Sequence, residues 1–377
     1  MTSSVSTTTT GRIVTRSFFD LLRTALGYAP QGSFDLNAEE WSRLHAQAAR
    51  QSLLGVTFYA IGRAVPNAGS ALPRQVYLKW FYHAESVKAL NAKHYELSRK
   101  LTALFEEQGV KAIVLKGQGN SRNYPDKFIR QTGDIDIWFA GGRKKVLAVL
   151  SQMGLLEKGV EMEHDVVFAD SVFGAELEVH YKFVRDSRNP FANRRLKRIL
   201  AQEIRNPVLV EEGFYVPTNR FSLLAQLSHI RKHLFTYGVG FRQVMDYAVL
   251  LRASSAAERA AVASVLKPTG LLPIAGALMW VLSECLGLES QYLLCKPDGR
   301  RGRVLLKALL KDGNFGKYAS RKRGGALRWW IGNRLHLLRM LPFDFPEVSW
   351  FLLRYWASFV FGVPERVLAF CRYKRHK

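Results

Sequence analysis

The sequence predicts a mixed α+β protein in which a small mixed sheet is flanked by N-terminal helices and a C-terminal helical domain. Apolar residues recur at helical spacing in the first part of the chain and again beyond Pro217. Between these parts, short β-branched runs end in glycine or in charged residues, as strands do. Hydrophobic residues make up 48% of the chain and charged residues 23%, which is the composition of a globular protein.

The N-terminal part of the chain divides into a tail and a helical segment. Residues 1–15 open with MTSSVSTTTT, which has neither the apolar core nor the basic start of a signal peptide, so we expect a disordered tail. Residues 16–94 are expected to form an N-terminal helical segment. Within it, Asn37 and Glu40 fit a capping box at the start of a helix.

The central part, residues 95–217, is expected to hold the sheet. A long helical pattern that starts after Pro73 leads into it and ends at Gly109, which suits a helix C-cap. The runs KAIVLKG, GDIDIWF, HDVVFAD and AELEVHYKF then predict about four strands. GGRKKVLAVLSQMG, with glycine at both ends, predicts a short helix between the second and the third strand.

Residues 218–377 are expected to form a basic C-terminal helical domain. Its last part interleaves Lys and Arg with tryptophan, and three interpretations are open. The region can be a helical core with basic side chains at its edge, a surface for acceptor RNA, or a surface for anionic membrane. VSWFLLRYWASFVFGV at 348–363 is too short and, with Arg354, too charged for a membrane span, so we expect a helix packed on the core.

The charge balance favours polyanionic partners. The chain has 55 Lys+Arg against 31 Asp+Glu and a net charge of +24, which would attract nucleotides, nucleic acid or anionic lipid. A basic surface without such a partner is the alternative. The three cysteines are scattered and odd in number, which argues against a disulfide framework and fits a reducing cytosol.

Asp134 and Asp136 alternate with isoleucines in GDIDIWF. Residues i and i+2 of a strand share a face, so both carboxylates point the same way while the isoleucines face a core. Two carboxylates this close repel each other unless one is protonated or a cation neutralises both. Oxygen ligands without His or Cys favour Mg²⁺ or Mn²⁺ over zinc. The alternative is an ordinary surface strand, which also alternates charged and apolar residues.

A third acidic ligand is expected if two metal ions are held. AELEVHYKF places Glu176, Glu178 and His180 on one strand face. We choose Glu178 because it stands at the centre of the strand, whereas Glu176 lies nearer the turn. His180 would flank the site, as a hydrogen-bond donor to the ligands or as a substrate contact.

A basic residue and a glycine precede these acids. Gly117 ends the first strand and would let backbone amides approach a phosphate closely, while Lys116 adds a point charge. Arg130, four residues before Asp134, can form a fork onto phosphate oxygens. The chain has no G-x-x-x-x-G-K-[ST] motif and no H-R-D with D-F-G, which excludes a P-loop enzyme and a protein kinase.

The pattern LKG…YPDKFIRQTGDIDIWF, then ELEVHYKF, then SHIRKHLF…FRQVMDYAVLL resembles a bacterial family of uncharacterised nucleotidyltransferases. Members of that family read LKG, R-x-x-x-D-x-D and E-x-H, followed by helices with a His and an R-x-x-x-D. The resemblance covers roughly residues 95–250 and implies the nucleotidyltransferase fold of the DNA polymerase beta superfamily. That superfamily usually has Gly-Ser or Gly-Gly after its first strand, where this chain has Lys-Gly-Gln.

The resemblance implies Mg²⁺- or Mn²⁺-dependent nucleotidyl transfer. An acceptor hydroxyl or phosphate would attack the α-phosphate of a nucleoside triphosphate (NTP), and pyrophosphate would leave. The acceptor stays open among a sugar phosphate, a peptide, a protein and tRNA. The catalytic and metal-binding residues carried over by position are Asp134, Asp136 and Glu178. Those expected to contact the nucleotide are Lys116, Gly117, Arg130 and His180.

Three further sets of polar residues receive structural interpretations. His229 and His233 stand at i and i+4 of a helix and could bind metal, but we expect packing or polar contacts. Arg242 and Asp246 have the same spacing and are expected to form a helix ion pair. His164, just before its strand, is expected to be structural.

The competing interpretation is a catalytically inactive protein with the transferase fold. Its basic surface would hold nucleic acid or an envelope-biosynthesis complex at the membrane surface. The three intact acids favour the enzyme. We expect the protein in the cytoplasm, with peripheral contact to the inner face of an anionic membrane as an open addition. The sequence indicates no oligomeric state.

Overall fold

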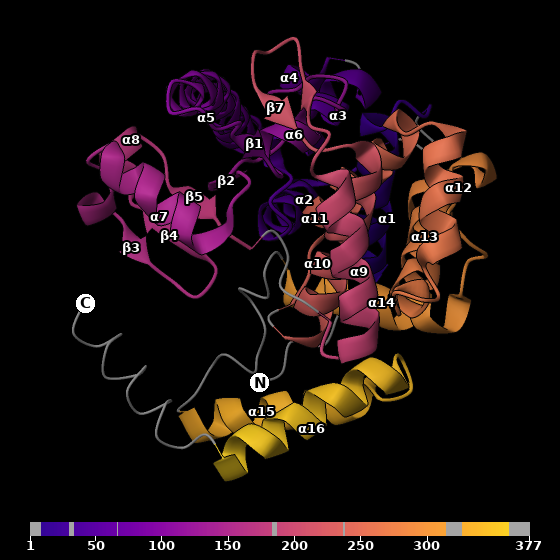
Figure 1. Cartoon of the computed structure of the whole chain (residues 1–377). Helices are drawn as coiled ribbons and strands as arrows, with labels where there is room; N and C mark the ends of the chain where they lie inside the picture. The colour runs from indigo at the N-terminus through magenta and orange to yellow at the C-terminus, as the bar shows by residue number, and fades with distance from the viewer. Residues whose placement is uncertain are drawn as a thin grey trace.

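The computed structural model describes the chain over residues 9–29, 34–65, 67–182, 187–236, 238–313 and 326–361. In this part of the protein, one mixed sheet lies beside a large group of helices (Figure 1). The mixed α+β fold class predicted from the sequence is therefore confirmed.

Helices make up the N-terminal part up to the first strand. They are α1 (Thr9–Ala25), α2 (Ala38–Arg50), α3 (Leu54–Ala64), α4 (Ala68–Ala71) and α5 (Arg74–Glu106). The predicted tail is wrong for residues 9–15, which belong to α1, whereas residues 1–8 lie outside the described residues. α1 buries Val14, Phe18 and Leu21, which recur at helical spacing, and this burial accounts for the early start of the helix.

Local helix signals act as predicted. The backbone N–H of Glu40 donates to Asn37 Oδ1, and the backbone N–H of Asn37 donates to Glu40 Oε2, both at 3.0 Å, so the capping box is confirmed. α5 begins directly after Pro73 and ends three residues before Gly109. Gly109 has φ +70°, the left-handed conformation that glycine adopts without strain after a helix end.

The sheet of the described chain has seven strands in the order β3-β4-β5-β2-β1-β7-β6. These are β1 (Ile113–Val114), β2 (Ile135–Trp138), β3 (Val160–Glu161), β4 (Asp165–Phe168), β5 (Leu177–His180), β6 (Val208–Leu209) and β7 (Tyr215–Val216). The expected number of about four strands is too low because β3, β6 and β7 have two residues each, too few for alternation to show in the sequence. Short helices connect the strands, namely α6 (Gln118–Ser121), α7 (Gly142–Gln152), η1 (Leu156–Lys158) and α8 (Asp170–Phe173).

The two faces of the sheet differ in chemistry. One face packs on α5 and α7 and forms an apolar core that includes Ile135, Ile137, Leu177 and Val179. Side chains alternate between the faces along a strand, so Asp136 and the other polar residues of β2 and β5 point away from this core. The polar face is turned towards the C-terminal helices.

The C-terminal helices pack against the N-terminal ones. They are α9 (Pro190–Glu203), α10 (Asn219–Phe235), α11 (Phe241–Ala253), α12 (Ala256–Val265), α13 (Leu272–Leu286), η2 (Ser290–Tyr292), α14 (Gly299–Asp312), α15 (Ala326–Met340) and α16 (Phe345–Phe361). The rings of Phe18 in α1 and Phe241 in α11 lie 5.7 Å apart, and both side chains are fully buried in one large core. The two helical segments that flank the sheet in the sequence therefore meet in space.

α15 and α16 lie side by side at the edge of the helical part (Figure 1). Val348 and Phe351 of α16 are buried, and the ring of Phe351 lies 6.1 Å from that of Phe235 in α10. This confirms the expected packing for the described part of 348–363. Among the described residues, none of the helices combines the length and the apolar character that crossing a bilayer requires.

Gly55 in α3 gives a test of how closely this helix packs on the loop that leads into β2. A Cβ atom at Gly55 would lie 2.3 Å from the backbone oxygen of Ile129, whereas a Cβ at Gly62 in the same helix would have no heavy atom within 4 Å. We expect Gly55→Ala to lower the free energy of unfolding by about 1–3 kcal/mol. Gly62→Ala is the matched control and should raise it by about 0.5–1 kcal/mol. Urea unfolding followed by circular dichroism measures both, and an equal response to the two changes would contradict the close approach.

Candidate active site

A cavity of about 410 Å³ lies between the polar face of the sheet and helices α10 and α11. Its sheet side is lined by residues from β2, β4, β5 and the loops beside them, and its other side by residues between Phe221 and Asp246. The lining includes every site residue predicted from the sequence, namely Lys116, Gly117, Arg130, Asp134, Asp136, Glu178 and His180.

The pairing of β2 with β5 brings the acids together. The two strands are parallel neighbours, and Asp136 stands directly opposite Glu178 in their register. Residues opposite each other in neighbouring strands point to the same face, so Glu178 lies beside Asp136 as expected. Asp134 directly precedes β2 and lines the same cavity.

Two basic side chains bind Asp136, which is 4% exposed. Lys116 Nζ donates to Asp136 Oδ1 at 2.8 Å, and His180 Nε2 lies 2.7 Å from the same oxygen. His180 Nε2 also lies 3.2 Å from Glu178 Oε2. One ligand atom each from Asp136, Glu178 and His180 lies within 4.8 Å of the other two, a spacing that a single metal ion can bridge.

The ionisable side chains of this cluster shift one another's pKa values. Repulsion from Asp136, with burial second, raises the pKa of Asp134 to about 6. Burial alone would raise the pKa of Asp136, but the charge of Lys116 and the hydrogen bond from His180 outweigh it and lower that pKa. Burial disfavours the charged form of His180, yet its bonds to Asp136 and Glu178 raise its pKa to about 9. The negative charge of the carboxylates in the cavity is thus offset by the positive charges of Lys116 and His180.

Lys116 and Gly117 stand where the first strand turns towards α6. Burial opposes the charge of Lys116, but Asp136 and Asp134 outweigh it and raise the lysine pKa. Gly117 has φ +50°, a backbone conformation that residues other than glycine rarely adopt, so this turn requires glycine. A Cβ at this position would have only ordinary contact with the backbone oxygen of Asp134 at 3.8 Å, so conformation and not crowding selects the glycine.

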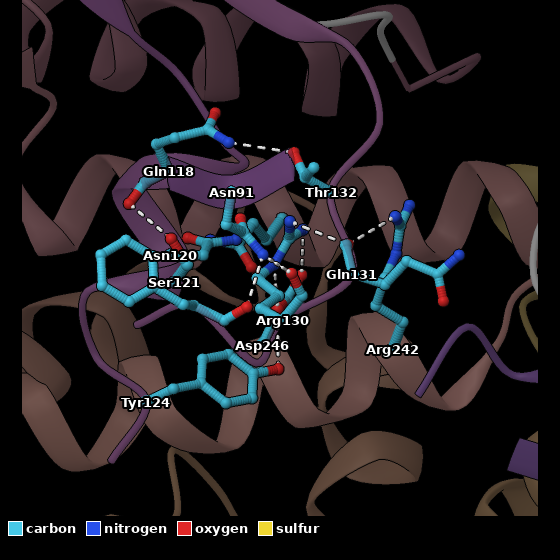
Figure 2. Close-up of polar contacts among 12 residues, drawn as sticks. Asn91, Gln118, Asn120, Ser121, Tyr124, Arg130, Gln131, Thr132, Arg242 and Asp246 are labelled. Atoms are coloured by element: carbon cyan, nitrogen blue, oxygen red, sulfur yellow. Dashed lines mark hydrogen bonds and ion pairs between the residues drawn. The ribbon is translucent and has the colours of Figure 1, made fainter. Parts of the chain in front are cut away.

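Arg130 has a different partner from the predicted phosphate. Its Nε donates to Asp246 Oδ1 at 2.7 Å and its Nη2 donates to Oδ2 at 2.8 Å, a bidentate pair between two buried side chains. The Tyr124 hydroxyl donates to Asp246 Oδ1 at 2.9 Å (Figure 2). This geometry holds the guanidinium against the protein at the edge of the cavity, and the phosphate contact of Arg130 stays a prediction. Asp246, expected to pair with Arg242 along the helix, is held by Arg130 from the loop before β2.

The loop between α6 and β2 is irregular but firmly held. Asn91 of α5 donates from Nδ2 to the backbone oxygens of Phe128 and Arg130. Arg242 of α11 donates from Nη1 to the backbone oxygen of Gln131 at 3.2 Å (Figure 2). Thr132 Oγ1 accepts from Gln118 Nε2 at 2.9 Å. The loop that delivers Asp134 is therefore bonded to helices on both sides.

Several lining residues were not predicted for the site. Asp165 opens β4 and pairs with His180 in the antiparallel β4–β5 register, which a single sequence does not reveal. His164, expected to be structural, also lines the cavity, and its backbone oxygen accepts from the N–H of Tyr181 and of Lys182. The unpredicted basic residues of the lining are Lys182, His229, Lys232 and Arg242. For His229 the sequence favours packing or polar contacts over metal binding, and for Arg242 it favours a helix ion pair.

On the wall of the cavity formed by α10 and α11, burial disfavours the charged forms of two basic residues, His229 and Arg242. Burial, with the neighbouring His233 second, lowers the pKa of His229 well below its usual value. The two rings lie 4.2 Å apart, centre to centre. Burial, with the nearby Arg130 second, lowers the pKa of Arg242 to about 10. An anion in the cavity would offset this cost, so the wall suits a negatively charged ligand.

A family model described as uncharacterised nucleotidyltransferase matches residues 37–287. The chain belongs to this family. The matched range covers well over half of the chain and contains both walls of the cavity, from Leu115 to Asp246. α14, α15 and α16 lie beyond it. No curated protein and no solved structure matches the chain.

Membership of this nucleotidyltransferase family gives the cavity a chemical setting. The acids and the basic groups of the cavity all lie within the residues that the family model matches. The family description names no acceptor.

Proposed function

We propose that the protein is a metal-dependent nucleotidyltransferase that moves a nucleoside monophosphate from an NTP to an acceptor. The observation that supports this most is the facing pair of Asp136 and Glu178 in adjacent strands, inside the cavity of a chain that belongs to a nucleotidyltransferase family. A pair of carboxylates on one sheet face, one buried and one partly exposed, is a donor set that Mg²⁺ or Mn²⁺ accepts.

The residues of the cavity fit a divalent metal ion. Asp134 shares the cavity with Asp136, and the repulsion that raises its pKa is the cost that a bound cation removes. Asp134, Asp136 and Glu178 would hold the metal, and His180 can contribute a nitrogen. Bound ions would make an acceptor hydroxyl a stronger nucleophile and would neutralise the leaving pyrophosphate.

The chain's own cations would bind and orient the triphosphate. Lys116 and Gly117 lie next to the acids, and Lys232 and Arg242 face them from the helical wall. The acceptor oxygen would form a bond to the α-phosphorus while the bond from that phosphorus to the β-phosphate bridging oxygen breaks. The proton of an acceptor hydroxyl would pass to water, and pyrophosphate would leave with the electron pair of the broken bond. Positioning and charge stabilisation are the protein's share of the catalysis.

The acceptor class is the open part of this proposal, and it includes a sugar phosphate, a peptide, a protein and tRNA. The proposal places the protein in the cytoplasm, where NTPs are available.

The test is a transfer assay with each labelled NTP, Mg²⁺ or Mn²⁺ and a cell extract as the source of acceptors. We expect label to move from one NTP to protein, RNA or a small molecule, with release of pyrophosphate. The matched control is the Asp134→Asn/Asp136→Asn double variant, which keeps the shape of both side chains but removes their charge. Equal transfer by this variant would rule out the mechanism.

A second candidate function is peripheral binding at an anionic surface, favoured by the exterior of α15 and α16. Leu338, Leu353 and Trp356 are 48%, 56% and 67% exposed. Glu347 of α16 and Asp344, which directly precedes that helix, are both buried, so the described charge on the outside of the two helices is positive. In this case the protein would pellet with anionic vesicles and would bind no NTP, with or without Mg²⁺. NTP binding that requires Mg²⁺ would favour the enzyme.

A further inference from the structure

We propose that His180 is a metal ligand held in place by Asp165, and that the site therefore selects a first-row transition ion such as Mn²⁺ over Mg²⁺. This inference rests on the proposed metal-dependent function and assigns a role to Asp165, which sequence patterns do not single out. It is carried by the strand registers, by the distances around one imidazole ring and by the chemistry of the donor atoms.

The strand registers bring four polar residues to one face. β5 is central, with β2 on one side and β4 on the other. Asp136 stands opposite Glu178 in the parallel pair, and Asp165 stands opposite His180 in the antiparallel pair. Three neighbouring strands thus contribute to one face of the sheet, on which His180 lies between Asp165 and the two other acids.

The two nitrogens of His180 face different groups. Nδ1 lies 3.3 Å from Asp165 Oδ2. Nε2 lies 2.7 Å from Asp136 Oδ1 and 3.2 Å from Glu178 Oε2. The side chain is 11% exposed, so the ring has little freedom to turn. A carboxylate that accepts from Nδ1–H fixes the proton on that nitrogen and leaves the Nε2 lone pair directed at the two acids.

This arrangement is that of a carboxylate–histidine–metal triad. In such triads the outer carboxylate sets the tautomer and the orientation of the ring, and it raises the basicity of the ligating nitrogen. The donor atoms of Asp136, Glu178 and His180 already lie within 4.8 Å of one another. Asp165 touches His180 and not the group of donor atoms, so we assign it as a positioning residue.

The donor set decides which ion is preferred. Mg²⁺ is bound almost entirely through oxygen and keeps several of its waters, whereas imidazole suits first-row transition ions. Two carboxylates with one imidazole therefore favour Mn²⁺ over Mg²⁺. If His180 served only as a hydrogen-bond donor to Asp136, the metal would have oxygen ligands alone and this preference would disappear.

The test measures metal binding by the full chain without any turnover. Free Mn²⁺ is followed by electron paramagnetic resonance while Mg²⁺ is added as a competitor. We expect the unchanged protein to retain Mn²⁺ at an excess of Mg²⁺, and we expect Asp165→Asn and His180→Gln each to weaken Mn²⁺ binding by about 10–100-fold. Asp170→Asn is the matched control, because Asp170 is an exposed acid five residues further along and should leave binding unchanged.

A second measurement needs no variant. In protein labelled with ¹⁵N-histidine and loaded with diamagnetic Zn²⁺, the Nε2 resonance of His180 should move to the range of a metal-bound nitrogen while Nδ1 keeps its proton. An Nε2 that remains protonated in the loaded protein would overturn the inference.

The outcomes separate this inference from the proposed function. Suppose that Asp136→Asn abolishes Mn²⁺ binding while Asp165→Asn and His180→Gln leave it unchanged. This result would overturn the inference, and the proposed transfer would then use a metal site made of carboxylates alone. Absence of Mn²⁺ binding by the unchanged protein would also overturn it, and the labelled-NTP assay would then decide the proposed function by itself.

Discussion

Asp136→Asn is expected to lower the rate of nucleotidyl transfer by about a thousand-fold or more. The loss of a metal ligand removes several kcal/mol of transition-state stabilisation, and each 1.36 kcal/mol corresponds to a factor of ten in rate. Asp136 is bound by Lys116 and His180 and stands opposite Glu178, so its carboxylate lies at the centre of the acidic group. The measurement is the initial rate of transfer at saturating NTP and metal.

The control for this change is Asp170→Asn, which removes the same charge from the surface near the end of β4. It should transfer at the rate of the unchanged protein. Circular dichroism must show that Asp136→Asn retains its helix content, because the asparagine loses its charge-assisted bonds to Lys116 and His180. A folded Asp136→Asn protein with a rate within about ten-fold of the original would contradict the assignment of Asp136 as a metal ligand.

Arg130→Met is expected to lower the free energy of unfolding by about 3–5 kcal/mol, because it leaves the Asp246 carboxylate buried without its bidentate partner. The double variant Arg130→Met/Asp246→Leu should regain most of this loss, since it removes both charges and fills the space with apolar groups. Urea unfolding of the two single variants and the double variant gives the coupling between the side chains directly.

The surface offers a matched comparison for this pair. Arg143 donates to Glu161 with the same bidentate geometry, at 2.6 and 2.9 Å, but both side chains are largely exposed to water. Arg143→Met should leave the unfolding midpoint nearly unchanged, because solvent screens exposed ion pairs. A similar response of the unfolding midpoint to Arg130→Met and to Arg143→Met would show that the buried pair has no special structural role.

Local signals in the sequence predicted local structure well. The capping box at Asn37, the long helix that ends before Gly109 and the strand with alternating isoleucines depend on residues a few positions apart, and the structure contains all three. β3, β6 and β7 were missed because they owe their conformation to pairing with a neighbour, as β6 does with β7. The start of α1 was missed because the burial of its apolar face depends on packing against other helices, which the residues of α1 alone do not show.

Some residues of the candidate site could likewise be predicted from the sequence, whereas other contacts in it could not. Asp134, Asp136 and Glu178 could be found because strand alternation and a family resemblance point to them. The partner of Arg130 could not, because Asp246 lies more than a hundred positions away. The helical spacing offered Arg242 as a nearer partner for that aspartate. Asp165 was overlooked for a related reason, since its place beside His180 depends on the antiparallel register of two strands.

The meeting of Phe18 and Phe241 in one core has a consequence for how the chain folds as it is made. α1 packs on α2 and α3, which follow it closely in the sequence, but it also meets α11 and α13, which lie more than two hundred residues later. The side of α1 that packs on these later helices therefore has no partner when it leaves the ribosome. At about 5–20 residues per second, the wait for α11 lasts on the order of ten to forty seconds. During that time the side of α1 that packs on α11 and α13 is open to other hydrophobic surfaces. We therefore expect nascent chains that stop before α11 to be bound by chaperones and to be sensitive to protease, and chains that include α13 to become resistant.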